Sequence, residues 1–345
     1  MTTTATDTAP LEPAADVQVQ RWSLPSRIGS GAYIAAAVAL ALLPMWGDAS
    51  LQLTMVEILY FLSLAQMWNL LAGYAGLVSV GQHGLVGVAA YTLMVLAERR
   101  GYDPFVAMVL AGVFVAALSI PIALFAFRLT GGYFAIGTWV IAEVLRLTTL
   151  QIDSLKAGNV QSLTPKKTFA GYELQQRVDY VYWAALALAV GATAIVIAVL
   201  RSKLGLALQA VRDDEPGARG LGVKVRRTKL IVWVIVAFWT GMTGAMIHLK
   251  SLTIVNTSSF DLLTYTALVI FIVVIGGVGS TAGPIIGVAI YWFITWQLED
   301  SNTMRFIILG SMAVLVAVAS RGGVNGLLQR IAPFELFPIR RRLRR

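Results

Sequence analysis

The chain has 345 residues, of which 57% are hydrophobic and only 13% are charged. A water-soluble domain of this composition would have more apolar surface than it could bury, so the composition predicts an integral membrane protein. The sequence has no cysteine, and its two histidines, His83 and His248, lie far apart along the chain. Disulfides, thiolate metal sites and cysteine nucleophiles are therefore excluded, and a metal centre or a His-based catalytic triad is not indicated.

The chain begins with a segment, residues 1–27, that is rich in Thr, Ala and Pro and lacks the apolar core of a cleavable signal. We expect it to form a disordered cytoplasmic tail. We assign residues 28–322 to a transmembrane domain and residues 323–345 to a basic cytoplasmic tail. Since a bilayer crossing needs about 20 mostly apolar residues, the hydropathy pattern predicts an all-α polytopic membrane protein with about ten spans, at residues 30–46, 51–72, 80–97, 105–127, 132–151, 180–200, 229–249, 262–276, 283–298 and 304–320.

Lys and Arg total 27 against 18 Asp and Glu, and they are concentrated in residues 201–229 and 321–345. Nucleic acid binding is one explanation, but cytoplasmic loops of membrane proteins also retain Lys and Arg. We therefore place the segment 201–228 and both termini on the cytoplasmic side of a bacterial cell membrane, and residues 152–179 in a periplasmic loop. Five basic residues run against this orientation, because the same count places them outside: Arg99, Arg100, Lys156, Lys166 and Lys167.

Glycine is concentrated within spans in two passages, GYAGLVSVGQHGLVG at residues 73–87 and GGVGSTAGPIIG at residues 276–287. Each glycine costs a helix about 1 kcal/mol relative to alanine, so these passages predict broken helices. Irregular backbone at membrane depth is tolerated where protein or a water-filled cavity covers it, and such breaks mark substrate routes in transporters. Close helix packing through small residues is the alternative explanation.

We recognise no catalytic motif in this sequence. The passage GGVGSTAGP at residues 276–284 lacks the lysine of a phosphate-binding loop, and no carboxylate cluster indicates a magnesium site. We therefore expect a chain without its own ATPase site.

Polar residues inside spans are costly and therefore informative. Glu143 and Arg146 stand three apart on one helix face, so we expect them to pair. His83 either bonds carbonyls freed by the break or faces a solute path, and Glu57 has no evident partner in its own helix. The full set of candidates is Glu57, Gln66, Asn69, Ser79, Gln82, His83, Thr138, Glu143, Arg146 and His248.

A polar stretch, AVRDDEPGARGLGVKVRR at residues 210–227, interrupts the apolar chain. Its acidic cluster suits a helix start, where the macrodipole favours negative charge, and Pro216 is tolerated in a first turn. Gly222 is suited to a C-terminal stop. The pattern predicts a helix of about two turns, which is too short to be stable alone. Either its neighbours or a partner protein must hold it, unless the stretch is a solvated loop.

Together these segments resemble the LivM-type permease subunits of branched-chain amino acid ABC importers. RSKLGLALQAVRDDEPGARGLGV resembles that family's cytoplasmic loop, in which an arginine-rich stretch leads into an acidic cluster and an E-x-A-A-x-x-L-G turn. NLLAGYAGLVSVGQHGLVGVAAYT at residues 69–92 and VIGGVGSTAGPIIGV at residues 274–288 are similar to its two glycine-rich signatures, and GGVNGLLQR near the C-terminus agrees. The chain departs from the family at Pro216, Gly217 and Gly220, which puts the strength of coupling in doubt.

The resemblance implies a set of partners. These are a second, LivH-like permease subunit, two ATPase subunits that bind ATP and Mg²⁺, an extracytoplasmic solute-binding protein and membrane lipid, but no nucleic acid. The 152–179 loop would be a docking surface for the binding protein. The short helix would couple ATPase closure to the spans through Asp213, Asp214, Glu215, Gly217, Ala218, Leu221 and Gly222.

The same resemblance implies a translocation path shaped by two sets of residues. The first is Gly73, Tyr74, Gly76, Ser79, Gly81, Gln82 and His83, and the second, opposite it, is Gly276, Gly277, Gly279 and Gly283. Branched-chain amino acids are the default cargo, while urea, short amides and aromatic or small carboxylates are carried by related permeases. Two further classes stay open: a stand-alone channel or ion-coupled carrier, and a membrane enzyme or scaffold.

Overall fold

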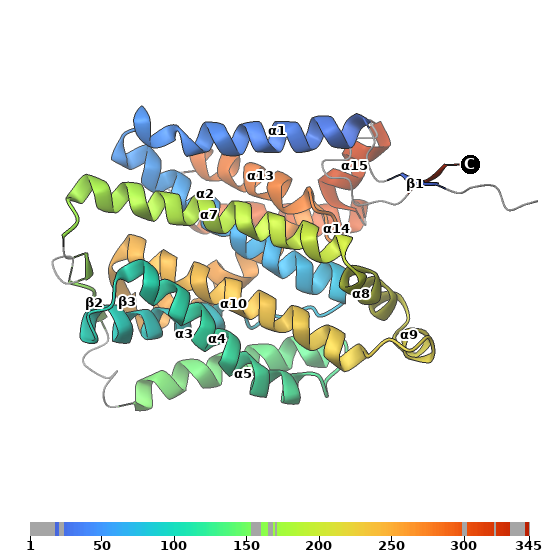
Figure 1. Cartoon of the computed structure of the whole chain (residues 1–345), viewed down its shortest axis with the longest axis horizontal. Coiled ribbons are helices and arrows are strands. Elements are labelled where there is room, and N and C mark those ends of the chain that lie inside the picture. Colours follow the sequence, from blue (N-terminus) through green and yellow to red (C-terminus); the bar gives the residue numbers. More distant parts are fainter. Residues whose placement is uncertain are drawn as a thin grey trace, which may run out of the picture.

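The computed structural model describes residues 18–20, 24–152, 160–164, 168–169, 171–298, 302–320, 322–331 and 342–344. The described chain is a bundle of roughly parallel and antiparallel helices with two small β-ribbons (Figure 1). The helices are α1 (Leu24–Ala41), α2 (Ala49–Asn69), α3 (Gln82–Leu93), α4 (Pro104–Ala126), α5 (Gly132–Gln151), α7 (Leu174–Arg201), α8 (Lys203–Asp213), α9 (Glu215–Gly220), α10 (Val225–Ser251), α11 (Asn256–Ser259), α12 (Leu268–Gly276), α13 (Gly283–Gln297), α14 (Asn302–Ala319) and α15 (Gly323–Ile331).

Shorter elements lie at the ends of these helices. A 3₁₀ turn, η1 (Leu43–Met45), precedes α2, and π-helical segments extend α2 and α3 and precede α12 at η2 (Leu70–Tyr74), η3 (Met94–Arg99) and η5 (Leu263–Ala267). The strands are three residues long and pair antiparallel, β1 (Gln18–Gln20) with β4 (Arg342–Arg344) and β2 (Val160–Ser162) with β3 (Thr253–Val255). The all-α architecture expected from composition is thus confirmed.

The expected count of about ten spans is not confirmed. Among the described residues seven helices are long and apolar enough to cross a membrane, or eight if the bent pair 303–319 and 323–330 is one span. Three expected spans are missing from the seven: 80–97, which contains α3, 283–298, which contains α13, and 304–320, where α14 counts only as part of the bent pair. The 15 residues of α13 span about 22 Å at 1.5 Å per residue, which is less than the roughly 30 Å of a bilayer core.

Local signals explain where the long helices start. The Asp103 carboxylate accepts hydrogen bonds from the backbone N–H groups of Phe105 and Val106, and Pro104 occupies the first position of α4. At α7, Glu173 and Gln176 form a reciprocal capping box. Each cap satisfies N–H groups that have no partner within the helix, which fixes the residue at which the helix begins.

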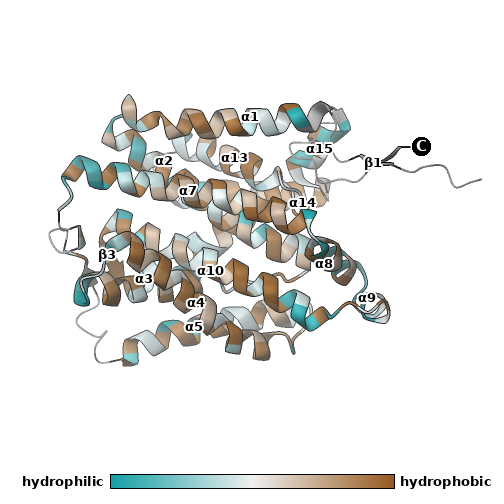
Figure 2. Ribbon diagram, in the orientation of Figure 1, coloured by the Kyte–Doolittle hydropathy of each residue, from teal (hydrophilic) through white to brown (hydrophobic). Residues whose placement is uncertain are grey.

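Helix α10 runs through the middle of the bundle and packs against α2, α3, α4 and α7 (Figure 1). Small residues allow the close approach: a Cβ on Gly241 would lie 3.1 Å from the Cα of Gly112 in α4, and one on Gly244 would lie 2.8 Å from the Cα of Val86 in α3. Every residue of α3 except Thr92 is buried. Hydrophobic residues predominate along the outer helices (Figure 2), and large apolar side chains such as Phe125, Trp139 and Val318 are exposed, which suits contact with lipid.

The bundle has two distinct ends. Helices α8 and α9 and the β1–β4 ribbon lie at one end, and the β2–β3 ribbon lies at the other (Figure 1). The β1–β4 pairing therefore brings residues 18–20 and 342–344 together at the end that carries the polar stretch. Of the expected tail 1–27, residues 1–17 and 21–23 lie outside the described residues, as do residues 332–341 and 345 of the expected tail 323–345. The expected 152–179 loop is described only at 152, 160–164, 168–169 and from 171 onward.

Candidate functional site

The first glycine-rich passage breaks the chain between α2 and α3. The π-helical segment Leu70–Tyr74 ends α2, residues 76–81 leave helical geometry, and α3 begins at Gln82. Gly76 has φ 69°, in the left-handed region that favours glycine. A Cβ on Gly81 would lie 2.3 Å from the carbonyl oxygen of Thr138 in α5. The break is therefore covered by protein.

The second passage makes a tight turn between α12 and α13. Gly277 and Gly279 have φ of 128° and 72°. A Cβ on Gly276 would lie 1.9 Å from the carbonyl oxygen of Gly283, and one on Gly283 would lie 2.2 Å from that of Gly277. No side chain fits at these positions, since each contact is with backbone.

The two breaks touch each other. The Asn69 side-chain amide accepts a hydrogen bond from the Gly279 backbone N–H and donates one to the Ser280 carbonyl, both 2.8 Å long. Gln66 Nε2 donates to the Thr281 carbonyl at 3.3 Å. Two amides of α2 thus satisfy backbone groups that the second break leaves without helical partners.

Gly73 and Tyr74 belong to this contact region. A Cβ on Gly73 would lie 2.5 Å from the backbone nitrogen of Gly279, while the Tyr74 side chain is buried in the apolar core beside the break. These close contacts are what packing through small residues requires. The role of the glycines in a translocation path stays a prediction.

The start of α3 holds an unusual polar group. Gln82 is 1% exposed, and among the described residues neither atom of its side-chain amide has a hydrogen-bond partner. Nearby, Trp68 Nε1 donates to the Ser79 carbonyl at 2.8 Å. A cavity of about 20 Å³ beside Ser79, Gly81 and Thr138 has room for about one water molecule. The packing around this break leaves no room for a larger solute in this cavity.

Both histidines have protein partners. His83 bonds Thr266 Oγ1 twice, through its backbone N–H and through Nδ1, each at 3.1 Å. His248 lies 2.8 Å from the Gly244 carbonyl through Nδ1 and 2.8 Å from Ser259 Oγ through Nε2. In this conformation both side chains tie helices together.

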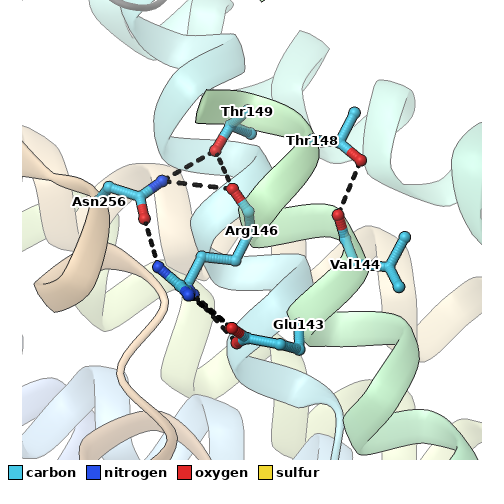
Figure 3. Close-up of polar contacts among 6 residues, drawn as sticks. All are labelled: Glu143, Val144, Arg146, Thr148, Thr149 and Asn256. Atoms are coloured by element: carbon cyan, nitrogen blue, oxygen red, sulfur yellow. Dashed lines mark hydrogen bonds and ion pairs between the residues drawn. The ribbon is translucent and has the colours of Figure 1, made fainter. Parts of the chain in front are cut away.

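The pairing expected between Glu143 and Arg146 is confirmed (Figure 3). Arg146 Nε lies 2.9 Å from Glu143 Oε2, and Arg146 Nη1 donates to Asn256 Oδ1 at 3.0 Å. Asn256 in turn donates to Thr149 Oγ1 at 2.9 Å. The pair fastens α5 to α11. Sequence reasoning missed Asn256, because no local spacing relates it to a helix more than 100 residues away.

The polar stretch folds into the short helix that its sequence predicts. Asp213 ends α8, Asp214 has an extended backbone, and α9 spans the six residues Glu215–Gly220. Gly222 has φ 84°. Its backbone N–H donates to the Arg219 carbonyl, and the backbone N–H of Val223 donates to the Ala218 carbonyl, both at 3.0 Å. These two bonds form a Schellman motif that ends the helix.

Neighbouring parts of the same chain hold α9 in place. Glu215 Oε2 lies 2.6 Å from Lys229 Nζ on α10. Ala218 is 3% exposed and packs against Val211 and Val225. The sequence left open whether neighbouring segments or a partner protein hold this short helix, and the structure shows support from neighbouring segments.

Three of the residues assigned to coupling, Gly217, Ala218 and Leu221, differ in their surroundings. Ala218 faces inward, and a Cβ on Gly217 would lie 2.2 Å from Asp214 Oδ2, so both serve packing within the loop. Leu221 is 85% exposed, and a Cβ on Gly220 would meet nothing within 4 Å. Gly220 ends α9 and Leu221 follows it, and together they form an exposed tip at the end of this helix.

Arg212 connects this loop to the first break. Its Nη1 donates to the Gly73 carbonyl at 2.8 Å, and its Nε donates to Asp213 at 2.9 Å. A Cβ on Gly76 would lie 3.2 Å from Arg212 Cγ. Sequence reasoning missed this residue, although its place directly before the acidic cluster was a signal. A displacement of α8 would act on the first break through this contact.

Comparison with known proteins agrees with the family resemblance seen in the sequence. The family model described as "Branched-chain amino acid transport system / permease component" matches residues 49–318, from the start of α2 into α14. The chain belongs to this family. The match includes both glycine breaks, α8 and α9, so the features described above lie within the shared permease region.

Two curated relatives are similar to this permease over most of its length. Both carry the name "High-affinity branched-chain amino acid transport system permease protein LivM", one from Escherichia coli (strain K12) and one from Salmonella typhimurium (strain LT2). Each is 29% identical over 289 residues, which cover 77% of this chain and 67% of the relative. No solved structure matches the chain. The permease is thus a LivM-type, multi-pass membrane component of a branched-chain amino acid transport system.

Proposed function

We propose that this permease is the LivM-type membrane subunit of an ABC importer that moves branched-chain amino acids into a bacterial cell. A soluble binding protein delivers the solute, and separate ATPase subunits bind ATP and Mg²⁺, so this chain itself needs no cofactor. The observation that carries the proposal is the arrangement of α8 and α9. Glu215 of α9 pairs with Lys229 of α10, and Arg212 of α8 bonds the Gly73 carbonyl in the first break. Leu221, directly after α9, is exposed.

The contacts supply a route for movement. An ATPase that displaces the tip moves α9 and α8 together, since Ala218 and Val211 pack against each other. Arg212 then acts on the Gly73 carbonyl, and Asn69 passes the displacement to the second break. Separation of the breaks would open the path and expose the unpartnered amide of Gln82 to the solute.

The proposal includes an orientation of the complex in the membrane. The end with α8, α9 and both termini faces the cytoplasm and the ATPases, as expected for a Lys- and Arg-rich loop. The end with β2 and β3 then faces the binding protein. A second, LivH-like permease subunit covers part of the apolar lateral surface, and membrane lipid covers the rest.

Replacing the exposed leucine at the tip tests the proposed docking. Leu221→Asp should leave folding unchanged, because the side chain is 85% exposed, but it should greatly reduce co-purification of the ATPase subunits with the permease. Leu174→Asp is the matched control, since Leu174 is 73% exposed at the start of α7, at the other end of the bundle. Equal ATPase recovery with both variants would refute docking at this tip.

A further inference from the structure

A second ion pair lies at the end of the bundle opposite α8 and α9. Lys250 Nζ, at the end of α10, lies 3.4 Å from Glu57 Oε2 on α2. Glu57 Oε1 lies 3.5 Å from the hydroxyl of Tyr291 on α13. Three helices that are distant in sequence therefore meet at two opposite charges. Charged residues at membrane depth are costly and mark functional sites unless they serve packing alone.

The geometry of this pair differs from that of the structural pair in α5. Arg146 bonds Glu143 through Nε at 2.9 Å and bonds Asn256 through Nη1 at 3.0 Å. The contacts of Glu57 are at the long limit for hydrogen bonds, at 3.4 and 3.5 Å. Lys250 has three donors, and within the described chain its one recorded hydrogen bond is the long contact with Glu57. Both charges thus retain capacity for a further partner.

The pair lies where the buried interior begins. Every residue of α2 from Leu59 to Asn69 is buried except Leu62, and residues 240–249 of α10 are buried throughout. The Glu57 and Lys250 side chains, just outside these runs, are 38% and 24% exposed. The two charges therefore stand at the rim of the closed core, at the end that receives solute in the proposed importer.

Aromatic rings line the inner side of this rim. Lys250 Nζ lies 6.0 Å from the centroid of the Tyr60 ring, and Phe61 packs edge-on against Tyr291 at 4.9 Å. Tyr60 and Tyr291 are buried. A carboxylate, an ammonium and an apolar aromatic wall match the three parts of a zwitterionic α-amino acid with an aliphatic side chain. Urea or a simple amide carries no charge that could pair with Glu57 or Lys250, and a simple carboxylate could pair only with Lys250.

We propose that Glu57 and Lys250 form a receiving site for zwitterionic α-amino acids at the mouth of the permease. The loose pair opens, Lys250 binds the α-carboxylate, Glu57 binds the α-ammonium, and the aliphatic side chain lies against Tyr60 and Tyr291. This site rests on the proposed function and narrows its cargo to zwitterions.

The test measures ligand binding rather than transport. The assembled complex in lipid nanodiscs, without the binding protein, is titrated by saturation-transfer NMR with L-leucine, with isocaproate, which lacks the ammonium, and with isoamylamine, which lacks the carboxylate. Wild-type complex should bind leucine about tenfold more tightly than either analogue, as a bond to a charged group contributes on this scale. Glu57→Gln should weaken leucine binding to the level of isocaproate without affecting isocaproate. Lys250→Met should weaken leucine binding to the level of isoamylamine without affecting isoamylamine.

Controls separate this role from a structural one. Lys250→Arg keeps the charge and should keep leucine binding, while Glu143→Gln and Arg146→Met should leave all three affinities unchanged. A purely structural pair would weaken all three ligands together or none of them, and either pattern overturns the proposal. Absence of leucine binding to the wild-type complex also overturns it. ATP-driven leucine uptake by the complete transporter would still support the proposed function in each of these cases.

Discussion

Gly276→Ala is expected to remove most of the folded permease. A Cβ at this position would lie 1.9 Å from the Gly283 carbonyl oxygen and 2.9 Å from the Gly287 backbone nitrogen. Because both atoms are backbone, no side-chain rotation relieves the overlap, and α12 must move away from α13. We expect a loss of about 3 kcal/mol or more, the upper range for overpacked cores. Fluorescence-detected size-exclusion chromatography after detergent extraction would show loss of the monodisperse peak.

The matched control is the same substitution where there is room. A Cβ on Gly31, within α1, would meet nothing within 4 Å, so Gly31→Ala should leave the peak intact and favour helix formation by up to about 1 kcal/mol. If Gly276→Ala gave the same peak and melting temperature as wild type, that result would contradict the close backbone contact between Gly276 and Gly283.

Glu215→Arg is expected to reduce ATP-driven uptake below about a tenth of wild type, with the permease still in the membrane. The substitution replaces the 2.6 Å contact with Lys229 by a repulsion, and Arg219, whose Nη2 lies 3.3 Å from Glu215 Oε1, adds to it. The short α9 then loses its anchor on α10. Even 1.4 kcal/mol lost from the coupled state corresponds to a tenfold change. The measurement is radiolabelled leucine uptake normalised to membrane-inserted permease.

A charge exchange identifies what Glu215 does. If its main task is to anchor α9, combining Glu215→Arg with Lys229→Glu restores the attraction and should recover much of the uptake. The fold supports this outcome, because Lys229 is only 17% exposed and faces Glu215. Full uptake by the single variant would show that the anchor has no part in coupling.

Much of the fold followed from composition and local pattern. Long apolar runs predicted helices because backbone groups in lipid must be satisfied within a segment, and all ten expected segments contain helix. The break glycines and the short α9 were also predictable, since Gly222 and Pro216 have strong local preferences. The number of spans was not, because a buried helix such as α3, or a short helix such as α13, need not match the bilayer thickness.

The contacts that join the site were beyond local reasoning. Asn69 meets Ser280 across 211 positions, and Arg212 meets Gly73 across 139. No periodicity relates residues so far apart, and only the packing of η2 against α8 and of α2 against α12 brings them together. The inward orientation of Ala218 was hidden for a similar reason, because in a six-residue helix the sequence does not show which side faces α10.

Reconstitution of the purified permease into liposomes, with and without its ATPase subunits, tests the motor-driven mechanism most directly. With the second permease, both ATPases, the binding protein and ATP present, radiolabelled leucine should accumulate inside the vesicles. Liposomes that hold this chain alone should show no leucine flux above protein-free vesicles. Steady leucine flux through the chain alone, independent of ATP, would contradict the mechanism and identify a channel or a carrier instead.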